Sequence, residues 1–112
     1  MQRNEDETGD TLARHPVTPD DEVERDLLLR YLARKRGDIG RLEGALAAED
    51  YALIRRIGHN LAGSGAAYGF VRISNLGQRI EVASGKSSSR EVAELIAELR
   101  RFLDTVMIED SR

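Results

Sequence analysis

The sequence contains no cysteine, has only three tyrosines and two phenylalanines as aromatic residues besides its two histidines, and lacks any long hydrophobic run. The absence of cysteine excludes a disulfide scaffold, a thiolate zinc site and a cysteine nucleophile. No apolar run approaches the roughly 18 residues that a membrane-spanning helix needs, so no membrane contact is expected. The first residues, MQRNEDETGD, also lack the apolar stretch of a secretory signal, and the expected location is the cytoplasm.

Excess positive charge is absent as well. The chain has 17 Lys and Arg against 20 Asp and Glu, which gives a net charge of −3 at pH 7. A strongly basic surface is the usual footprint of nucleic-acid binding, so no nucleic-acid partner is expected. The length of 112 residues suits one domain and is too short for separate cofactor and substrate domains.

The first part of the chain is predicted to be a flexible tail. Residues 1–17 hold few apolar side chains, and these show no helical period, so their burial would not offset the entropy of ordering them. Thr18 and Pro19 then form a typical helix start. We therefore expect one folded domain over residues 18–109.

Five helical segments are predicted within that domain. The first ends at Lys35-Arg36-Gly37, because basic residues followed by glycine signal a helix end. The second runs from about Asp38 to Ala48. The third follows a cap at Asp50 and ends near Gly69, the fourth covers about 71–84, and the fifth follows Ser88. No segment alternates with period two, so the expected fold is all-α: an antiparallel four-helix bundle with an additional N-terminal helix.

The glycine-rich stretch over residues 54–70 carries the functional information. Ile54, Ile57 and Leu61 define its buried stripe, and a helical projection places His59 about 160° from the centre of that stripe. His59 is therefore expected to face solvent. An imidazole is substantially neutral at pH 7, and its unprotonated nitrogen can act as a nucleophile.

Small and basic residues surround this histidine in the projection. Ala62, Gly63 and Ala66 lie beside it toward the C-terminus, and Arg55 and Arg56 flank it one turn earlier. The small residues leave space for a bulky group on the ring or for close approach of a second protein. The arginines are candidates for contact with a phosphate or with a partner's acidic pocket.

Simpler interpretations compete with this one. An exposed helical histidine is most often solvated surface, and faces of glycine and alanine are often helix-packing seams. The glycines at 63, 65 and 69 resemble a dinucleotide loop, but they follow no predicted strand and lack an acidic partner. One exposed histidine is also a poor metal site, so no metal or cofactor is expected in this chain.

The segment H-N-L-A-G-S-G-A-A-Y-G-F, residues 59–70, resembles the motif of the histidine-phosphotransfer (HPt) domains, H-x-L-K-G-S-x-x-x-x-G. The resemblance covers roughly residues 20–107. HPt domains are four-helix bundles that relay phosphoryl groups in multistep two-component signalling. The resemblance implies that His59 is the phosphoacceptor and that Gly63 leaves room for the phosphoryl group. It also implies that Leu61, Gly69 and Phe70 are structural positions, and that Ser64 serves in packing or hydrogen bonding.

Two further positions follow from the resemblance. Glu81 matches a position on the next helix that is often Glu or Gln and hydrogen-bonds the histidine; a plain surface carboxylate is the competing interpretation. At Ala62 the family usually has a lysine that helps to hold the phosphoryl oxygens. Arg55 or Arg56 is a candidate to compensate, against the alternative of a solvated helix face.

The implied function is a phosphorelay intermediate, not an enzyme. His59 would accept a phosphoryl group from a receiver-domain phosphoaspartate and pass it to another receiver, with Mg²⁺ supplied by the receiver. The implied partners are response-regulator receiver domains and a hybrid histidine kinase. The chain is expected to be a monomer, because the apolar stripe of its last helix is needed within the bundle.

Three alternatives remain open from the sequence. A histidine kinase acting in trans could phosphorylate the domain, although the absence of an ATP-binding domain before the end at Arg112 favours a free-standing relay. A bundle that binds receivers without being phosphorylated would suit Ala62. A structural adaptor would function without His59.

Overall fold

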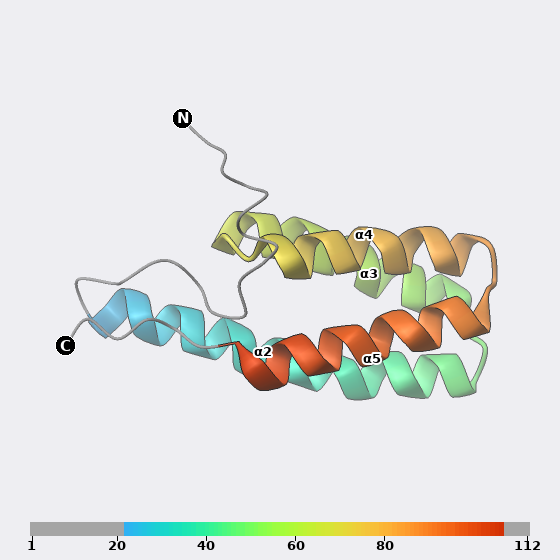
Figure 1. Ribbon diagram of the computed structural model, residues 1–112, viewed down its shortest axis with the longest axis horizontal. Coiled ribbons are helices and arrows are strands. Elements are labelled where there is room, and N and C mark those ends of the chain that lie inside the picture. The colour runs from blue at the N-terminus through green and yellow to red at the C-terminus, as the bar shows by residue number, and fades with distance from the viewer. Residues whose placement is uncertain (1–21, 107–112) are drawn as a thin grey trace.

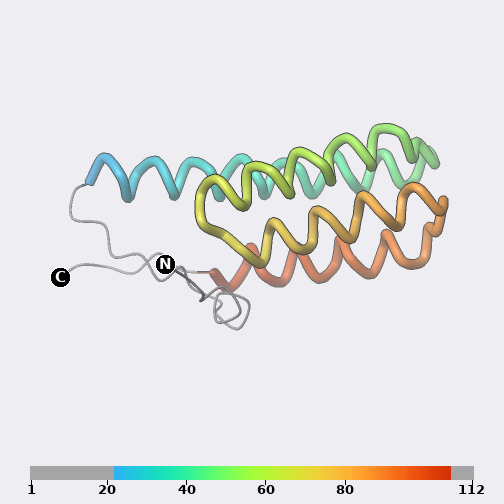
Figure 2. The backbone as a smooth tube through the Cα atoms, turned by 90° about the horizontal axis from the view of Figure 1, so that it is seen from above, coloured from blue at the N-terminus to red at the C-terminus, as the bar shows by residue number. Residues whose placement is uncertain are grey.

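The computed structural model describes residues 22–106, which form an antiparallel bundle of four helices. The helices are α2 (Glu22–Ala47), α3 (Tyr51–Tyr68), α4 (Val71–Gly85) and α5 (Ser89–Thr105), and no strand occurs among these residues. Figure 1 shows α3 and α4 above α2 and α5, and Figure 2, turned by 90°, separates α2 and α3 from α4 and α5. Each helix therefore packs against two neighbours, and α3 and α4 make the most extensive pair. The prediction of an all-α antiparallel four-helix bundle is confirmed.

Some sequence predictions concern parts of the chain outside this description. The tail over residues 1–17, the helix start at Thr18 and the domain end at residue 109 all lie outside the described residues.

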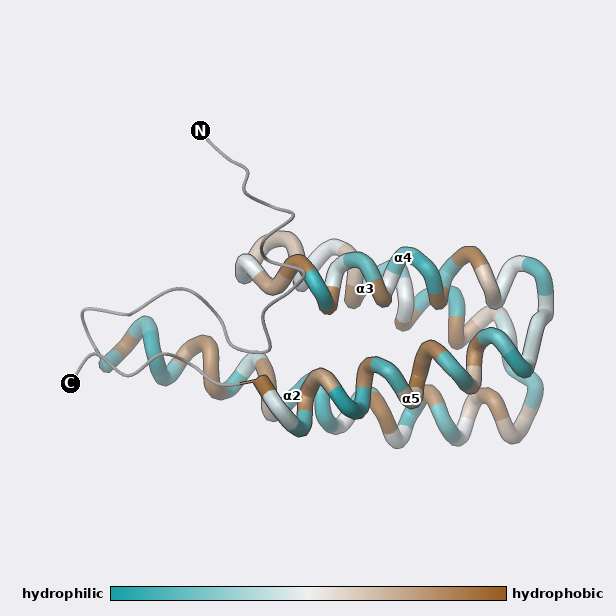
Figure 3. The backbone as a smooth tube through the Cα atoms, in the orientation of Figure 1, coloured by the Kyte–Doolittle hydropathy of each residue, from teal (hydrophilic) through white to brown (hydrophobic). Residues whose placement is uncertain are grey.

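The core consists of one apolar stripe from each helix. Hydrophobic segments alternate with hydrophilic ones along all four helices (Figure 3), as expected for helices that bury one face. Burial of each large aliphatic side chain contributes about 1.5–3 kcal/mol. The large side chains with 1% exposure or less are Tyr31, Leu42, Ile54, Leu61, Ile73, Leu76, Ile80, Val92, Leu99 and Leu103.

The predicted helix break near residue 37 is wrong. The supposed additional N-terminal helix and the segment after it are one continuous helix, the 26-residue α2. Leu32 and Ile39 are both buried on the core side of α2, on either side of Gly37, so one unbroken helix keeps both in register. Glycine in a helix costs about 1 kcal/mol relative to alanine, which is less than the burial of one such side chain contributes.

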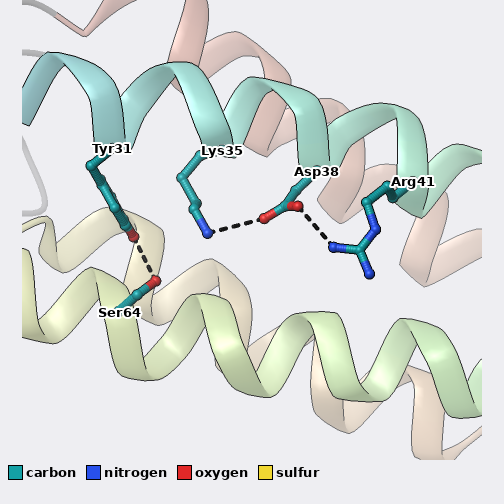
Figure 4. Close-up of polar contacts among 5 residues, drawn as sticks. All are labelled: Tyr31, Lys35, Asp38, Arg41 and Ser64. Atoms are coloured by element: carbon teal, nitrogen blue, oxygen red, sulfur yellow. Dashed lines mark hydrogen bonds and ion pairs between the residues drawn. The ribbon is translucent and has the colours of Figure 1, made fainter.

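Asp38, predicted to begin a new helix, has a different role inside α2. Its carboxylate pairs with Lys35 and Arg41, each at 3.1 Å, within one turn on either side (Figure 4). Such i,i+3 pairs support a helix that continues through the site. The stop signal of basic residues before a glycine is therefore overridden by local ion pairs and by core packing.

The other predicted helix boundaries agree with the structure. Asp50 caps α3 by accepting a hydrogen bond from the Leu53 N–H at 3.1 Å, and Ser88 caps α5 by accepting one from the Glu91 N–H at 3.3 Å. Gly69 ends α3 with φ at 84°, a left-handed conformation that glycine adopts without steric cost. Within residues 22–106, none of the helices combines the length and the apolar character needed to cross a membrane.

Candidate functional site

The site is built on an unusually close crossing of α3 and α4. A Cβ atom on Gly77 would lie 2.5 Å from the Ala62 amide nitrogen, and one on Gly65 would lie 2.6 Å from the Ser74 amide nitrogen. Only glycine allows two helix backbones to approach this closely. The Ser74 hydroxyl adds a hydrogen bond to the Ala62 carbonyl oxygen at 2.9 Å. Gly65 is buried, and its neighbours across the crossing are Ile73 and Ser74 of α4.

His59 lies at the outer edge of this crossing, and its side chain is 73% exposed. Its Nδ1 atom is 3.4 Å from Oε2 of Glu81, which lies one turn beyond Gly77 on α4. A carboxylate at Nδ1 favours the tautomer that carries its proton there, which leaves the lone pair of Nε2 free. The structure thus brings together the two residues that the sequence named as nucleophile and hydrogen-bond partner.

Open space lies next to His59 on its C-terminal side. A Cβ atom on Gly63 would have no heavy atom within 4 Å, Ala66 is exposed, and Ala62 is partly buried beside α4. Helical side chains lean toward the N-terminus of their helix, so a long side chain at position 63 would lean over His59. Glycine at this position keeps the ring accessible to a large group.

The exposed face of α3 carries positive charge only. Apart from the titratable His59, its charged side chains are Arg55 and Arg56, and both are exposed. Neither arginine forms an ion pair with another residue of the described range 22–106. Two unpaired guanidinium groups therefore lie one turn before the imidazole, in a chain whose net charge is −3.

A second polar contact fixes the opposite side of α3 to α2. The hydroxyls of Tyr31 and Ser64 are 2.8 Å apart (Figure 4), and the Tyr31 ring stacks on Tyr68 with centroids 4.2 Å apart and on Phe70 at 5.6 Å. Burial raises the pKa of Tyr31. Ser64 thus has the hydrogen-bonding role that the resemblance implied. Sequence reasoning missed Tyr31 as its partner, although a tyrosine in an apolar stripe signals a hydroxyl that needs one.

The arrangement is an open surface and not an enclosed active site. A pocket lies between α2 and α5, lined among others by Arg36, Ile39 and Arg100, and it includes none of the predicted site residues. Across residues 22–106, no group of three or more His, Asp or Glu side chains is placed to hold a metal ion. What the surface offers is a nucleophilic ring, a carboxylate behind it and unpaired cations beside it.

The family model described as the Hpt domain matches residues 26–107 of the chain. The chain belongs to the Hpt domain family. The matched region includes α3, α4 and α5 in full and nearly all of α2. No curated protein and no solved structure matches the chain. As an Hpt domain, the protein is a histidine-phosphotransfer module of phosphorelay signalling.

Proposed function

We propose that this Hpt domain accepts a phosphoryl group from a receiver-domain phosphoaspartate on His59 and passes it to another receiver domain. The observation that carries the proposal is the state of His59 itself. Its ring is 73% exposed and its Nδ1 atom lies 3.4 Å from the Glu81 carboxylate. Nε2 is then the nitrogen available to a phosphorus atom that approaches from solvent.

The transfer uses few groups of this chain. The Nε2 lone pair attacks the phosphorus in line, a P–N bond forms, and the P–O bond breaks with its electrons left on the receiver's aspartate. The imidazole ring becomes positively charged in this step, and the Glu81 carboxylate offsets that charge. The return transfer reverses the step on a second receiver. Positioning by the docked complex and Mg²⁺ held by the receiver supply the remaining catalysis, so this chain needs no cofactor of its own.

The same proposal includes the partners, the location and the oligomeric state of the protein. The partners are response-regulator receiver domains and a hybrid histidine kinase that carries the donor receiver, met in the cytoplasm by a monomeric Hpt domain. The unpaired Arg55 and Arg56 support an acidic docking partner. Burial of Val92, Leu95 and Leu99 inside the bundle supports the monomer, because α5 has no apolar stripe left for a second copy.

A bundle that binds receivers without being phosphorylated is the second candidate. Ala62 favours it, because this residue supplies no cation where the family usually has lysine. Phosphorylation in trans by a histidine kinase is a variant of the first candidate, with ATP as the original donor. The receiver-fed relay, the non-phosphorylated bundle and the kinase-fed variant differ in whether His59 becomes phosphorylated and in which protein donates the phosphoryl group.

The deciding experiment incubates the purified protein with a phosphorylated receiver domain and Mg²⁺. We expect acid-labile, alkali-stable phosphate on the wild-type protein and none on the His59→Gln variant. If the label appears only with a histidine kinase and ATP, the kinase and not a receiver domain is the phosphodonor. A folded wild-type protein that takes no label from receivers or kinases would leave the non-phosphorylated binding bundle as the function.

A further inference from the structure

A phosphoryl group on His59 would meet an unfavourable local charge. The charged group in contact with the ring is the Glu81 carboxylate, 3.4 Å from Nδ1, and it has the same sign as the phosphoryl oxygens. Position 62, one turn after His59, is an alanine and adds no cation. Because like charges at short range disfavour the ionised phosphoryl group, a cation elsewhere on this face would stabilise it.

Several basic residues of the two helices beside α3 are already engaged in ion pairs. On α2, Lys35 and Arg41 both pair with Asp38 at 3.1 Å. On α4, Arg72 and Arg79 are both directed to one carboxylate on α5, at 2.6 and 4.0 Å. Arg55 and Arg56 have no ion-pair partner among residues 22–106, and they lie on the same helix as His59.

Arg55 and Arg56 lie on opposite sides of His59 around the α3 axis. At about 100° per residue, Arg55 is displaced by about 40° to one side and Arg56 by about 60° to the other. Ala62, whose amide contacts Gly77 of α4, lies within about 20° of Arg55 around the axis. Arg55 thus lies on the α4 side of the ring, along the same strip of helix as position 62, whereas Arg56 lies on the α2 side.

The lean of helical side chains directs the ring toward the preceding turn of α3. His59 projects back over the turn that bears Arg55 and Arg56, because Cα–Cβ bonds point to the helix N-terminus. With Nδ1 directed to Glu81 on α4, Nε2 is the ring nitrogen left for a phosphoryl group. A guanidinium group presents several N–H donors in a fork that fits phosphoryl oxygens.

We infer that Arg55 binds the phosphoryl oxygens of phosphorylated His59 and that Arg56 does not. This inference rests on the proposed role of His59 as phosphoacceptor. Arg55, one turn before His59, would then take the place of the lysine that the family usually has one turn after the histidine, at position 62. Both positions lie on the same strip of α3.

The test uses phosphoramidate as phosphodonor and needs no partner protein. The P–N bond to the leaving ammonia breaks as the bond to Nε2 forms, and the ³¹P signal of the phosphorylated protein is then followed against pH. A nearby guanidinium favours the dianion and lowers the pH at which the phosphoryl group titrates. We expect Arg55→Gln to raise that midpoint by about 0.5 pH unit, and the matched control Arg56→Gln to raise it by less than half as much.

A rescue variant separates a direct contact from a general loss of charge. Ala62→Lys in the Arg55→Gln background restores a cation on the same strip, and the titration midpoint should return toward the wild-type value. Thermal melts of all variants show whether the bundle is intact.

Equal midpoints for Arg55→Gln and Arg56→Gln, or a larger shift for Arg56→Gln, would overturn the inference and leave the relay itself untouched. Failure of transfer between receivers and the wild-type protein would instead refute the relay, while the phosphoramidate titration would still report on Arg55.

Discussion

Gly58 of α3 and Gly77 of α4 meet backbone to backbone: a Cβ on Gly77 would lie 2.7 Å from the Gly58 carbonyl oxygen, and one on Gly58 would lie 2.9 Å from the Gly77 carbonyl oxygen. His59 follows Gly58 directly, and Glu81 lies one turn after Gly77. The contact between the two glycines therefore determines how far the imidazole is from its carboxylate.

Replacing Gly77 with alanine should loosen this arrangement. The added methyl group would overlap the α3 backbone, which cannot rotate away as a side chain can, so we expect a loss of about 1–3 kcal/mol in the free energy of unfolding. The transfer rate to His59 should fall as well, because the two helices separate. Urea denaturation and the receiver assay measure the two effects. Gly85→Ala on the same helix is the control, since its Cβ would meet nothing within 4 Å; equal stabilities of the two variants would contradict the prediction.

Gly63 should respond to substitution in the opposite way. A Cβ there meets nothing within 4 Å, and alanine is the better helix former, so Gly63→Ala should raise stability by about 0.5–1 kcal/mol. Gly63→Leu should also fold, but its side chain would lean over His59 and block transfer. Thermal melts and labelling separate the two outcomes. If Gly63→Leu accepted the phosphoryl group at the wild-type rate, the space next to the His59 ring would not be needed for transfer.

His59 itself should be dispensable for folding. Its side chain is 73% exposed, so His59→Gln should change the free energy of unfolding by no more than about 0.5 kcal/mol while abolishing the label. Leu61, with 0% exposure two residues further on, provides the contrast, because Leu61→Ala should cost about 2–5 kcal/mol. A His59→Gln protein that unfolds would mean that the ring has a structural role.

Tyr31 should make stability depend on pH in the alkaline range. Burial raises the pKa of its hydroxyl in the folded protein, so the unfolded chain ionises first, near pH 10. The stabilisation is therefore complete below about pH 10 and is lost as pH rises above that value. Tyr31→Phe keeps the ring stacking, loses the hydrogen bond to Ser64 at a cost of about 1 kcal/mol at neutral pH, and should show less of this alkaline loss. Urea denaturation at neutral pH and near pH 10.5 gives the free energy of unfolding of the two proteins. An equal loss of this free energy in both proteins would contradict the role of the Tyr31 hydroxyl.

Local signals in the sequence were sufficient for much of the fold. Asp50, Gly69 and Ser88 mark helix ends because each satisfies backbone groups within a few residues of itself. The exposure of His59 followed from the regular spacing of Ile54, Ile57 and Leu61, which defines one buried face of α3. These features depend only on neighbours along the chain.

The features that sequence reasoning missed depend on contacts between helices. Gly37 resembles a helix end, and only the shared burial of Leu32 and Ile39 across it shows that α2 continues. The approach of Glu81 to His59 could not be derived from either helix alone, because it follows from the distance of closest approach between α3 and α4. Projections give the direction of a side chain but not its partner.

The close α3–α4 crossing also has a consequence for amide hydrogen exchange. The amide hydrogens of α3 and α4 where the helices touch through Gly58, Gly65 and Gly77 are shielded by backbone on both sides, so they should exchange only when the two helices separate completely. On α2, Gly37, Gly40 and Gly44 face open space, and their amides should exchange through local opening of that helix. The imidazole is thus expected to lie on a part of the bundle that opens later than the glycine positions of α2.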